Sequence, residues 1–151
     1  MPTTTIDRAT SADGPAILDL LAANSLPGDG LLEHLHHAFV ARSGSRIVGC
    51  AALEVYGDGA LLRSVAVDAG FRGQGLGERL SRSAVDLATT LELPAVYLLT
   101  TTAERFFPKL GFGRIPRDHV PPGVQQSIEF RSVCCASAAV MMKPLTGADG
   151  C

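Results

Sequence analysis

Apolar and polar positions along the chain follow two periods, and each change of period predicts an element of secondary structure. Short runs that alternate or are apolar throughout predict strands, whereas apolar residues three or four positions apart predict helices. The predicted strands are 3–6, 39–41, 47–55, 61–67, 95–99, a short one near 112, and 138–143. The predicted helices are one that follows Thr10 or Ser11 and ends before "SLPGDG", then 31–37, 76–91, 103–110 and 124–130.

Several of these elements carry signals for where they begin or end. Thr10 or Ser11 can cap the first helix, with Asp13 in its first turn, and Gly111 suits a helix C-terminus. The runs "RSGSR" and "YGDGA" read as hairpin turns between strands. The resulting order, β-α-α-β-β-β-α-β-α-β-(α)-β, predicts a mixed sheet within an α/β sandwich.

Composition changes this picture little, but it excludes some classes of partner. A chain of 151 residues with 46% hydrophobic and 19% charged residues predicts one domain over residues 1–151, with 146–151 as a loose tail. A net charge of −2 gives no electrostatic reason to expect nucleic acid or an anionic membrane as partner. No apolar run reaches the length of a membrane span, and the start lacks a signal peptide. We expect a cytoplasmic monomer or homodimer.

Cysteine and histidine positions argue against a metal site. The four cysteines, at 50, 134, 135 and 151, have no CxxC spacing and outline neither a zinc site nor a disulfide framework. The run "HLHH" at 34–37 lacks the spacing and third ligand of a helical zinc site. We therefore predict no bound metal.

The stretch "FRGQGLGERL", Phe71–Leu80, places three glycines directly before the predicted helix at 76–91. Glycine loops that follow strands commonly bind phosphate through bare backbone N–H groups and a helix N-terminus. A Walker A loop would end in Gly-Lys-Ser/Thr, whereas Glu78 follows Gly77 here. A dinucleotide fingerprint needs G-x-G-x-x-G after the first strand of a βαβ unit, and this spacing differs. The remaining pattern is R-x-x-G-x-G, formed by Arg72, Gly75 and Gly77.

This pattern resembles the GNAT superfamily of acetyl-CoA-dependent N-acetyltransferases, over residues 3 to 145. A second stretch, "AERFFPKLGF", resembles the family's A-x-x-F-Y-x-x-x-G-F helix. The resemblance implies a GNAT-type mixed, mostly antiparallel central sheet flanked by helices on both faces. It also implies that the loop holds the diphosphate of acetyl-CoA, the acetyl donor. The residues implied at that position are Arg72, Gly73, Gln74, Gly75, Leu76, Gly77 and Glu78.

The resemblance assigns roles to other residues as well. The main chains of Val65 and Val67 would pair with the pantetheine arm, and one amide would polarise the thioester carbonyl. Phe106 and Lys109 would line the other wall of the cofactor slot. The family's tyrosine acid is replaced by Phe107, which has no proton to give. Water, Ser64 or Thr102 could take its place, or the thiolate could leave without an acid.

Two charged residues in the predicted sheet are candidates for the acceptor side of the reaction. Glu54 is the best-placed carboxylate for a general base, although it could equally be a solvent-facing strand residue. Arg63 lies within an apolar strand, where an unpaired cation is costly. It could bind the carboxylate of an acceptor, or form an internal salt bridge with Glu54.

For the acceptor, "ALLRSVAV", "LLTTTAERFFPKLGF" and "FRSVCCASAAVMMKPL" are similar to GNAT proteins associated with arsenic resistance. The resemblance implies a small amino-acid-like amine, including arsenical or phosphinic analogues, and a role in detoxification. Phosphinothricin-type enzymes have a glutamate just before the R-S-V stretch, where this chain has Leu62. Two alternatives stay open: an acyl-CoA-binding module without turnover, and an arsenical-binding protein that uses Cys134 and Cys135 as soft ligands.

Overall fold

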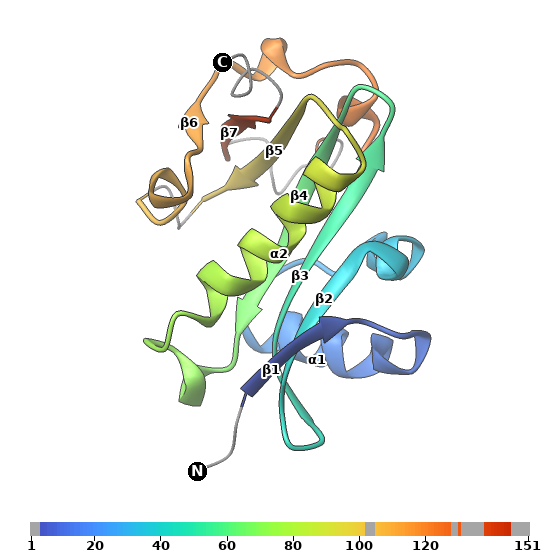
Figure 1. The fold of residues 1–151 in the computed structure, drawn as a ribbon, viewed down its shortest axis with the longest axis vertical. Helices are drawn as coiled ribbons and strands as arrows, with labels where there is room; N and C mark the ends of the chain where they lie inside the picture. Colours follow the sequence, from blue (N-terminus) through green and yellow to red (C-terminus); the bar gives the residue numbers. More distant parts are fainter. Residues whose placement is uncertain (1–3, 102–104, 128–129, 131–137, 146–151) are drawn as a thin grey trace. The chain divides into compact units, whose positions relative to one another are not determined.

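Seven strands hydrogen-bond in the order β1-β2-β3-β4-β5-β7-β6 (Figure 1). The structure is a computed structural model that describes residues 4–101, 105–127, 130 and 138–145. The strands are β1 Thr4–Arg8, β2 Ala38–Ser43, β3 Arg46–Tyr56, β4 Gly59–Val67, β5 Ala95–Thr100, β6 Gly113–Arg114 and β7 Ala139–Pro144. The α-helices whose bounds the structure describes are α1 Gly14–Ala23 and α2 Leu76–Thr90. The 3-10 helices are Ser11–Asp13, Leu31–His37, Ala69–Phe71, Phe107–Leu110, Arg117–His119 and Val124–Gln126.

The chain forms two units that interleave along the sequence. The first contains Met1–Leu53 and Ser64–Ala84, and the second contains Glu54–Arg63 and Val85–Cys151. β1 with β2, β2 with β3, β5 with β7 and β6 with β7 are antiparallel, and β4 with β5 is parallel. The predicted mixed, mostly antiparallel sheet is therefore confirmed.

In the first unit, helices cover both faces of the strands. The core on one face joins α1 to alternate strand residues, as alternation requires; its members include Ile17, Leu20, Leu21, Val40, Cys50, Ala52 and Ala66. On the opposite face, a Cβ built on Gly49 would lie 2.9 Å from the Leu80 side chain of α2. Glycine at this position lets α2 approach the sheet closely.

In the second unit, β5 is the central strand. It pairs with β7 along its whole length, from Ala95↔Pro144 to Thr100↔Ala139. Its parallel pairing with β4 covers Ala60↔Val96 and Leu61↔Tyr97. The core of this unit contains Leu61, Ala95, Tyr97, Val120, Val124 and Val140.

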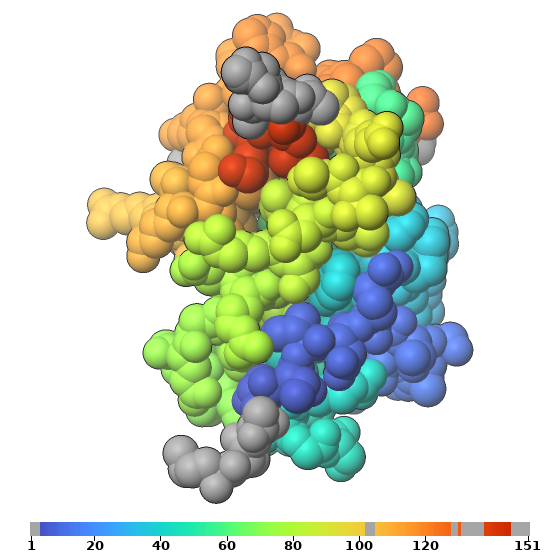
Figure 2. Space-filling model, viewed as in Figure 1, coloured from blue at the N-terminus to red at the C-terminus, as the bar shows by residue number. Residues whose placement is uncertain are grey.

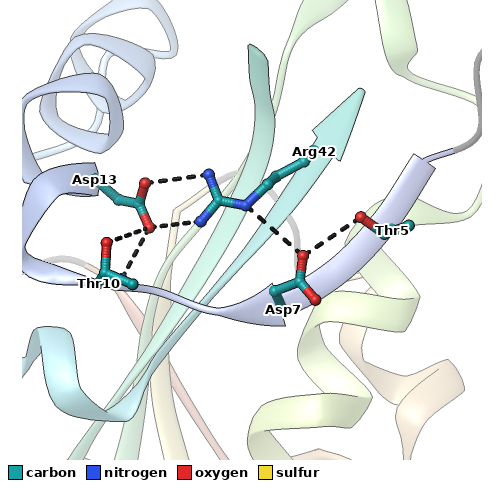
Figure 3. A network of polar contacts seen from close by, with 5 residues as sticks. All are labelled: Thr5, Asp7, Thr10, Asp13 and Arg42. Carbon is teal, nitrogen blue, oxygen red and sulfur yellow. Dashed lines mark hydrogen bonds and ion pairs between the residues drawn. The ribbon is translucent and has the colours of Figure 1, made fainter. Parts of the chain in front are cut away.

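A polar network ties the first helical turn to the edge of the sheet in the first unit (Figure 3). Arg42 of β2 donates to both carboxylate oxygens of Asp13, at 3.1 and 2.8 Å. Asp13 also accepts the backbone N–H of Thr10 at 2.8 Å, so Thr10 is the predicted N-cap residue. The weaker contact of Arg42 is with Asp7 of β1, at 3.7 Å.

Two predicted helices differ from the structure. The C-terminus of the helix predicted at 103–110 is confirmed, because Gly111 caps it with a φ of 97°. The described helix is shorter, and it is the 3-10 helix Phe107–Leu110. Residues 102–104 lie outside the described part of the chain. The prediction at 124–130 is met in part: Val124–Gln126 is a 3-10 helix, the backbone leaves the helical conformation at Ser127, and Phe130 is helical again. Residues 128–129 lie outside the described part of the chain. No helix in the described part has the length and apolarity needed to cross a membrane.

Candidate active site

The glycine loop follows β4 and leads into α2 within the first unit. Gly73 and Gly75 have φ angles of 82° and 80°, a region that side chains other than glycine rarely adopt. A Cβ built on either residue would meet nothing within 4 Å. Glycine is therefore required by the backbone conformation, and the space beside both residues is open to a ligand.

The first turn of α2 follows this loop directly. The Gly75 carbonyl accepts the N–H of Arg79 at 3.0 Å, which makes Gly75 the first residue of the helical hydrogen-bond pattern. The N–H groups of a first turn have no partner within the helix, and a glycine has no side chain to cap them. Leu76 anchors the turn because it is only 2% exposed. This arrangement suits an anionic group such as a diphosphate.

Asp68, which follows β4, and Arg46 of β3 stabilise the segment before the glycines. The Asp68 carboxylate accepts the N–H of Gly70 at 2.9 Å and pairs with Arg46 at 2.6 Å. The Arg46 guanidinium also lies 5.9 Å from the centre of the Phe71 ring. Figure 2 shows part of the segment that leads from β4 into α2, in green, at the surface of the molecule. Sequence reasoning missed both bracing residues, since nothing in the spacing links position 46 to position 68.

Arg72 is exposed and is held by neutral oxygen atoms. Its Nε donates to the carbonyl of Val67 at 3.2 Å, and its Nη2 donates to the side-chain oxygen of Asn24. Within the described part of the chain, no carboxylate lies at ion-pair distance from this guanidinium. Its positive charge is therefore available to a ligand of the loop. The predicted Gln74 is exposed, and Glu78 forms an i,i+4 pair with Arg82 at 2.9 Å.

β4 changes conformation at Ser64. This residue has a φ of 60°, which is rare for a residue with a Cβ. The Cys50 thiol donates to the Ser64 carbonyl at 3.1 Å. Burial raises the pKa of Cys50 to about 12, so this thiol supports the kink and stays protonated near neutral pH. Val65 and Val67 are half-buried beyond the kink.

Glu54, Arg63 and Tyr56 form one polar cluster in the second unit. Glu54 pairs with Arg63 at 2.8 Å, and neither side chain is exposed. The Tyr56 hydroxyl donates to the other Glu54 oxygen at 2.5 Å. Burial, followed by the hydrogen bond to Glu54 and the charge of Glu54, raises the pKa of Tyr56. The predicted carboxylate thus has a cation on one oxygen and a neutral phenol on the other.

This cluster bears on two predictions. Of the two roles open to Arg63, the structure contains the internal salt bridge with Glu54. Glu54 is not the solvent-facing strand residue that was the alternative, because it is 0% exposed. Tyr56 was missed, although Glu54 and Tyr56 are two residues apart on one strand and so share a face.

The segment that resembles the second family motif lies in the second unit. Phe107 is 6% exposed and packs edge-on against Phe106 at 4.9 Å and Phe112 at 5.8 Å between ring centres. Phe106 is half-buried and Lys109 is exposed. The described residues contain no group of three side chains able to hold a metal ion. Thr102, Cys134 and Cys135 lie outside the described residues.

Comparison with known families gives a match for this arrangement. The model of the acetyltransferase (GNAT) domain matches residues 34–114, more than half of the chain. The sequence is 33% identical over 120 residues to an amino-acid acetyltransferase of Mycobacterium tuberculosis, covering 73% of this chain and 68% of the relative. The chain spans between 60% and 68% of the length of the curated relatives that it matches.

Solved structures share the fold. N-acetylglutamate synthase from Neisseria gonorrhoeae, complexed with coenzyme A and N-acetyl-glutamate, superposes with a TM-score of 0.81 at 23% identity. The match covers 96% of this chain and 36% of that one. Rv2747 from Mycobacterium tuberculosis, in complex with CoA and NLQ, superposes with a TM-score of 0.77 at 26% identity, covering 93% and 99%.

Proposed function

The chain belongs to the GNAT acetyltransferase family, and we propose that it acetylates the amine of a small amino-acid-like acceptor with acetyl-CoA as donor. The observation that carries the proposal is the loop before α2. Two glycines with positive φ, open space beside them and a helix N-terminus directly after them are the features that suit a diphosphate. Arg72 adds a positive charge that no described carboxylate neutralises.

The proposed donor site extends from this loop along the end of β4. The N–H groups of 73–78 would hold the diphosphate, and the main chains of Val65 and Val67 would pair with the pantetheine arm. The Val67 carbonyl accepts from Arg72 in this structure, so Arg72 would release it or share it when the arm pairs. The family motif supports Phe106 and Lys109 as residues that would line the other wall of the acetyl-CoA slot.

Acetyl-CoA supplies a thioester whose carbonyl carbon the acceptor amine attacks, with the thiolate leaving. The acceptor must lose a proton, and we assign this proton to Glu54 as general base, through Tyr56. Glu54 is fully buried, whereas Tyr56 is half-buried and donates to it. The phenol can pass its own proton to Glu54 as it takes one from the amine or from a water. Arg63 would position the carboxylate by its contact with the other oxygen.

The departing thiolate has no tyrosine acid in this proposal. Phe107 has no hydroxyl and is buried among aromatic rings. A thiol with a pKa near 8.5 leaves as a thiolate without full protonation, and water, Ser64 or Thr102 would otherwise supply the proton. The absence of a tyrosine at Phe107 also favours a second candidate, an acyl-CoA-binding module without turnover.

The acceptor class rests on two different supports. A relative named as an amino-acid acetyltransferase supports a free amino acid. The finer proposal, an arsenical or phosphinic amino-acid analogue, rests on the sequence resemblance alone. Because Arg63 is engaged by Glu54, it does not add independent support for an anionic acceptor.

A thiol-release assay tests the function and the acceptor together. Acetyl-CoA is incubated with L-glutamate, neutral amino acids, a phosphinic glutamate analogue and an arsinic (pentavalent) glutamate analogue, and free thiol is followed over time. Turnover with amino acids supports the enzyme, and its rank order identifies the acceptor class. Coenzyme A binding by calorimetry without thiol release from any acceptor would instead support the binding module.

A further inference from the structure

Asn24 lies in a tightly defined turn at the end of α1. The N–H of Leu26 bonds the carbonyl of Leu21 at 2.9 Å, and the N–H of Ser25 bonds that of Ala22 at 3.1 Å. This pair of bonds, with Ser25 at φ 58°, is a Schellman turn. The backbone of Asn24 is therefore fixed by the helix end rather than by a free loop.

The orientation of the Asn24 side chain follows from its two partners. Its Nδ2 donates to the carbonyl of Leu20 at 2.9 Å, and its Oδ1 accepts from Arg72. A carbonyl can only accept and a guanidinium can only donate, so the amide cannot be reversed. One amide thus connects the end of α1 to a residue 48 positions later in the chain.

Because both partners of Arg72 are neutral, its guanidinium keeps its full positive charge. Asn24 and the Val67 carbonyl fix two of its nitrogen atoms without neutralising it. An aspartate at position 24 would hold the same guanidinium more strongly, but as an ion pair that competes with an anionic ligand. An amide orders the side chain and leaves its charge for the ligand.

We propose that Asn24 is a positioning residue of the donor site: it holds Arg72 of the glycine loop in place, as a neutral acceptor, before acetyl-CoA binds. The inference rests on the proposed role of the loop in binding the diphosphate. Ordering the Arg72 side chain in advance reduces the conformational entropy that is lost when acetyl-CoA binds. The contact between the loop and the end of α1 has this effect.

The test is a double-mutant cycle on acetyl-CoA affinity, measured by calorimetry. We expect Asn24→Ala to weaken binding about threefold to tenfold in the wild-type background, because Arg72 loses its prior order. In the Arg72→Ala background the same change should have no effect. Asn24→Asp should weaken binding more than Asn24→Ala. S-acetylpantetheine, which lacks the diphosphate, should show an unchanged KM with all these variants.

Ser25→Gly is the matched control, because it alters the same turn without touching Arg72 and relieves a positive φ. It should leave acetyl-CoA affinity unchanged. Equal losses from Asn24→Ala in both backgrounds, or wild-type affinity in Asn24→Asp, would overturn the proposal while leaving the loop assignment intact. An Arg72→Ala protein with undiminished acetyl-CoA affinity would remove the loop assignment itself.

Discussion

At the scale of single residues, Arg63 shows how burial decides between two roles. Its side chain is completely buried, where a cation is tolerated only with a partner of opposite charge. Glu54 is that partner, and it is equally buried. Replacing either residue alone removes the opposite charge that this contact gives to the other, so the two must be considered as one unit.

We expect Arg63→Lys to destabilise the protein by about 1–3 kcal/mol, because lysine cannot reproduce the donors of the planar guanidinium. Catalytic efficiency should fall by a similar factor for anionic and neutral amine acceptors, since Arg63 acts through Glu54. Thermal unfolding and steady-state kinetics with one acceptor of each kind measure this. A selective rise in KM for the anionic acceptor at an unchanged melting temperature would restore direct acceptor binding to Arg63.

Tyr56 is the second residue whose role can be isolated. Tyr56→Phe removes the phenol that donates to Glu54 while keeping the ring. We expect the turnover to fall roughly 100-fold or more, in the range typical of general acid–base groups. Tyr97→Phe is the control, because Tyr97 belongs to the apolar core of the second unit. Kinetics of both variants with the best acceptor decide the matter: equal, small losses would exclude Tyr56 from proton transfer.

At the scale of elements, the Asp13–Arg42 pair joins β2 to the turn before α1 (Figure 3). The hydrogen bonds from Arg42 hold the pKa of Asp13 below its usual value of 3.8, with the Thr10 N–H acting in the same direction. A carboxyl with a lowered pKa stabilises the fold above its unfolded pKa. That contribution is lost as the pH falls through the folded pKa.

We therefore expect Asp13→Asn to lower the free energy of unfolding by about 1–2 kcal/mol at pH 7, a modest value because Arg42 is 26% exposed and water screens the pair. The difference from wild type should narrow as the pH falls below 3.8 and through the lowered pKa of folded Asp13. Asp7→Asn is the control: Asp7 is 54% exposed and 3.7 Å from Arg42, so little should change. Urea unfolding at several pH values measures both, and a constant difference at all pH values would contradict the assignment.

The positions of helices and strands were predictable where the residues that form the apolar pattern are also the residues that pack in the core. The stripe from Leu76 to Ala84 predicts α2 because the same residues pack on the sheet, as Leu80 does over Gly49. The helix predicted at 124–130 is interrupted, because the 3-10 helix Val124–Gln126 ends at Ser127 before the helical residue Phe130. Within the site, the glycine loop could be predicted from its spacing. The contacts of Asn24 and Arg46 could not, since they join residues far apart in the sequence.

At the scale of the whole molecule, a ligand that binds only the folded chain stabilises it against unfolding. At a concentration about 100 times its Kd, a ligand adds roughly 2.7 kcal/mol. For a chain of this size, that corresponds to a rise in melting temperature of about 5–10 °C. The rise measures binding in the folded state and needs no acceptor, so it is independent of catalysis.

We expect acetyl-CoA to produce this rise in the wild-type protein and to lose most of it in Gly75→Val. A valine at a φ of 80° is strained, and its branched side chain fills the open space beside the loop. Gly44→Val is the matched control, because Gly44 has a φ of 64°, lies in the β2–β3 hairpin turn and also has nothing within 4 Å of its Cβ position. Both variants should melt lower than wild type without ligand, by similar amounts, since both carry the same kind of backbone strain. Only Gly44→Val should keep the response to acetyl-CoA. An equal response in both, measured by thermal unfolding across a ligand titration, would mean that the glycine loop does not hold the donor.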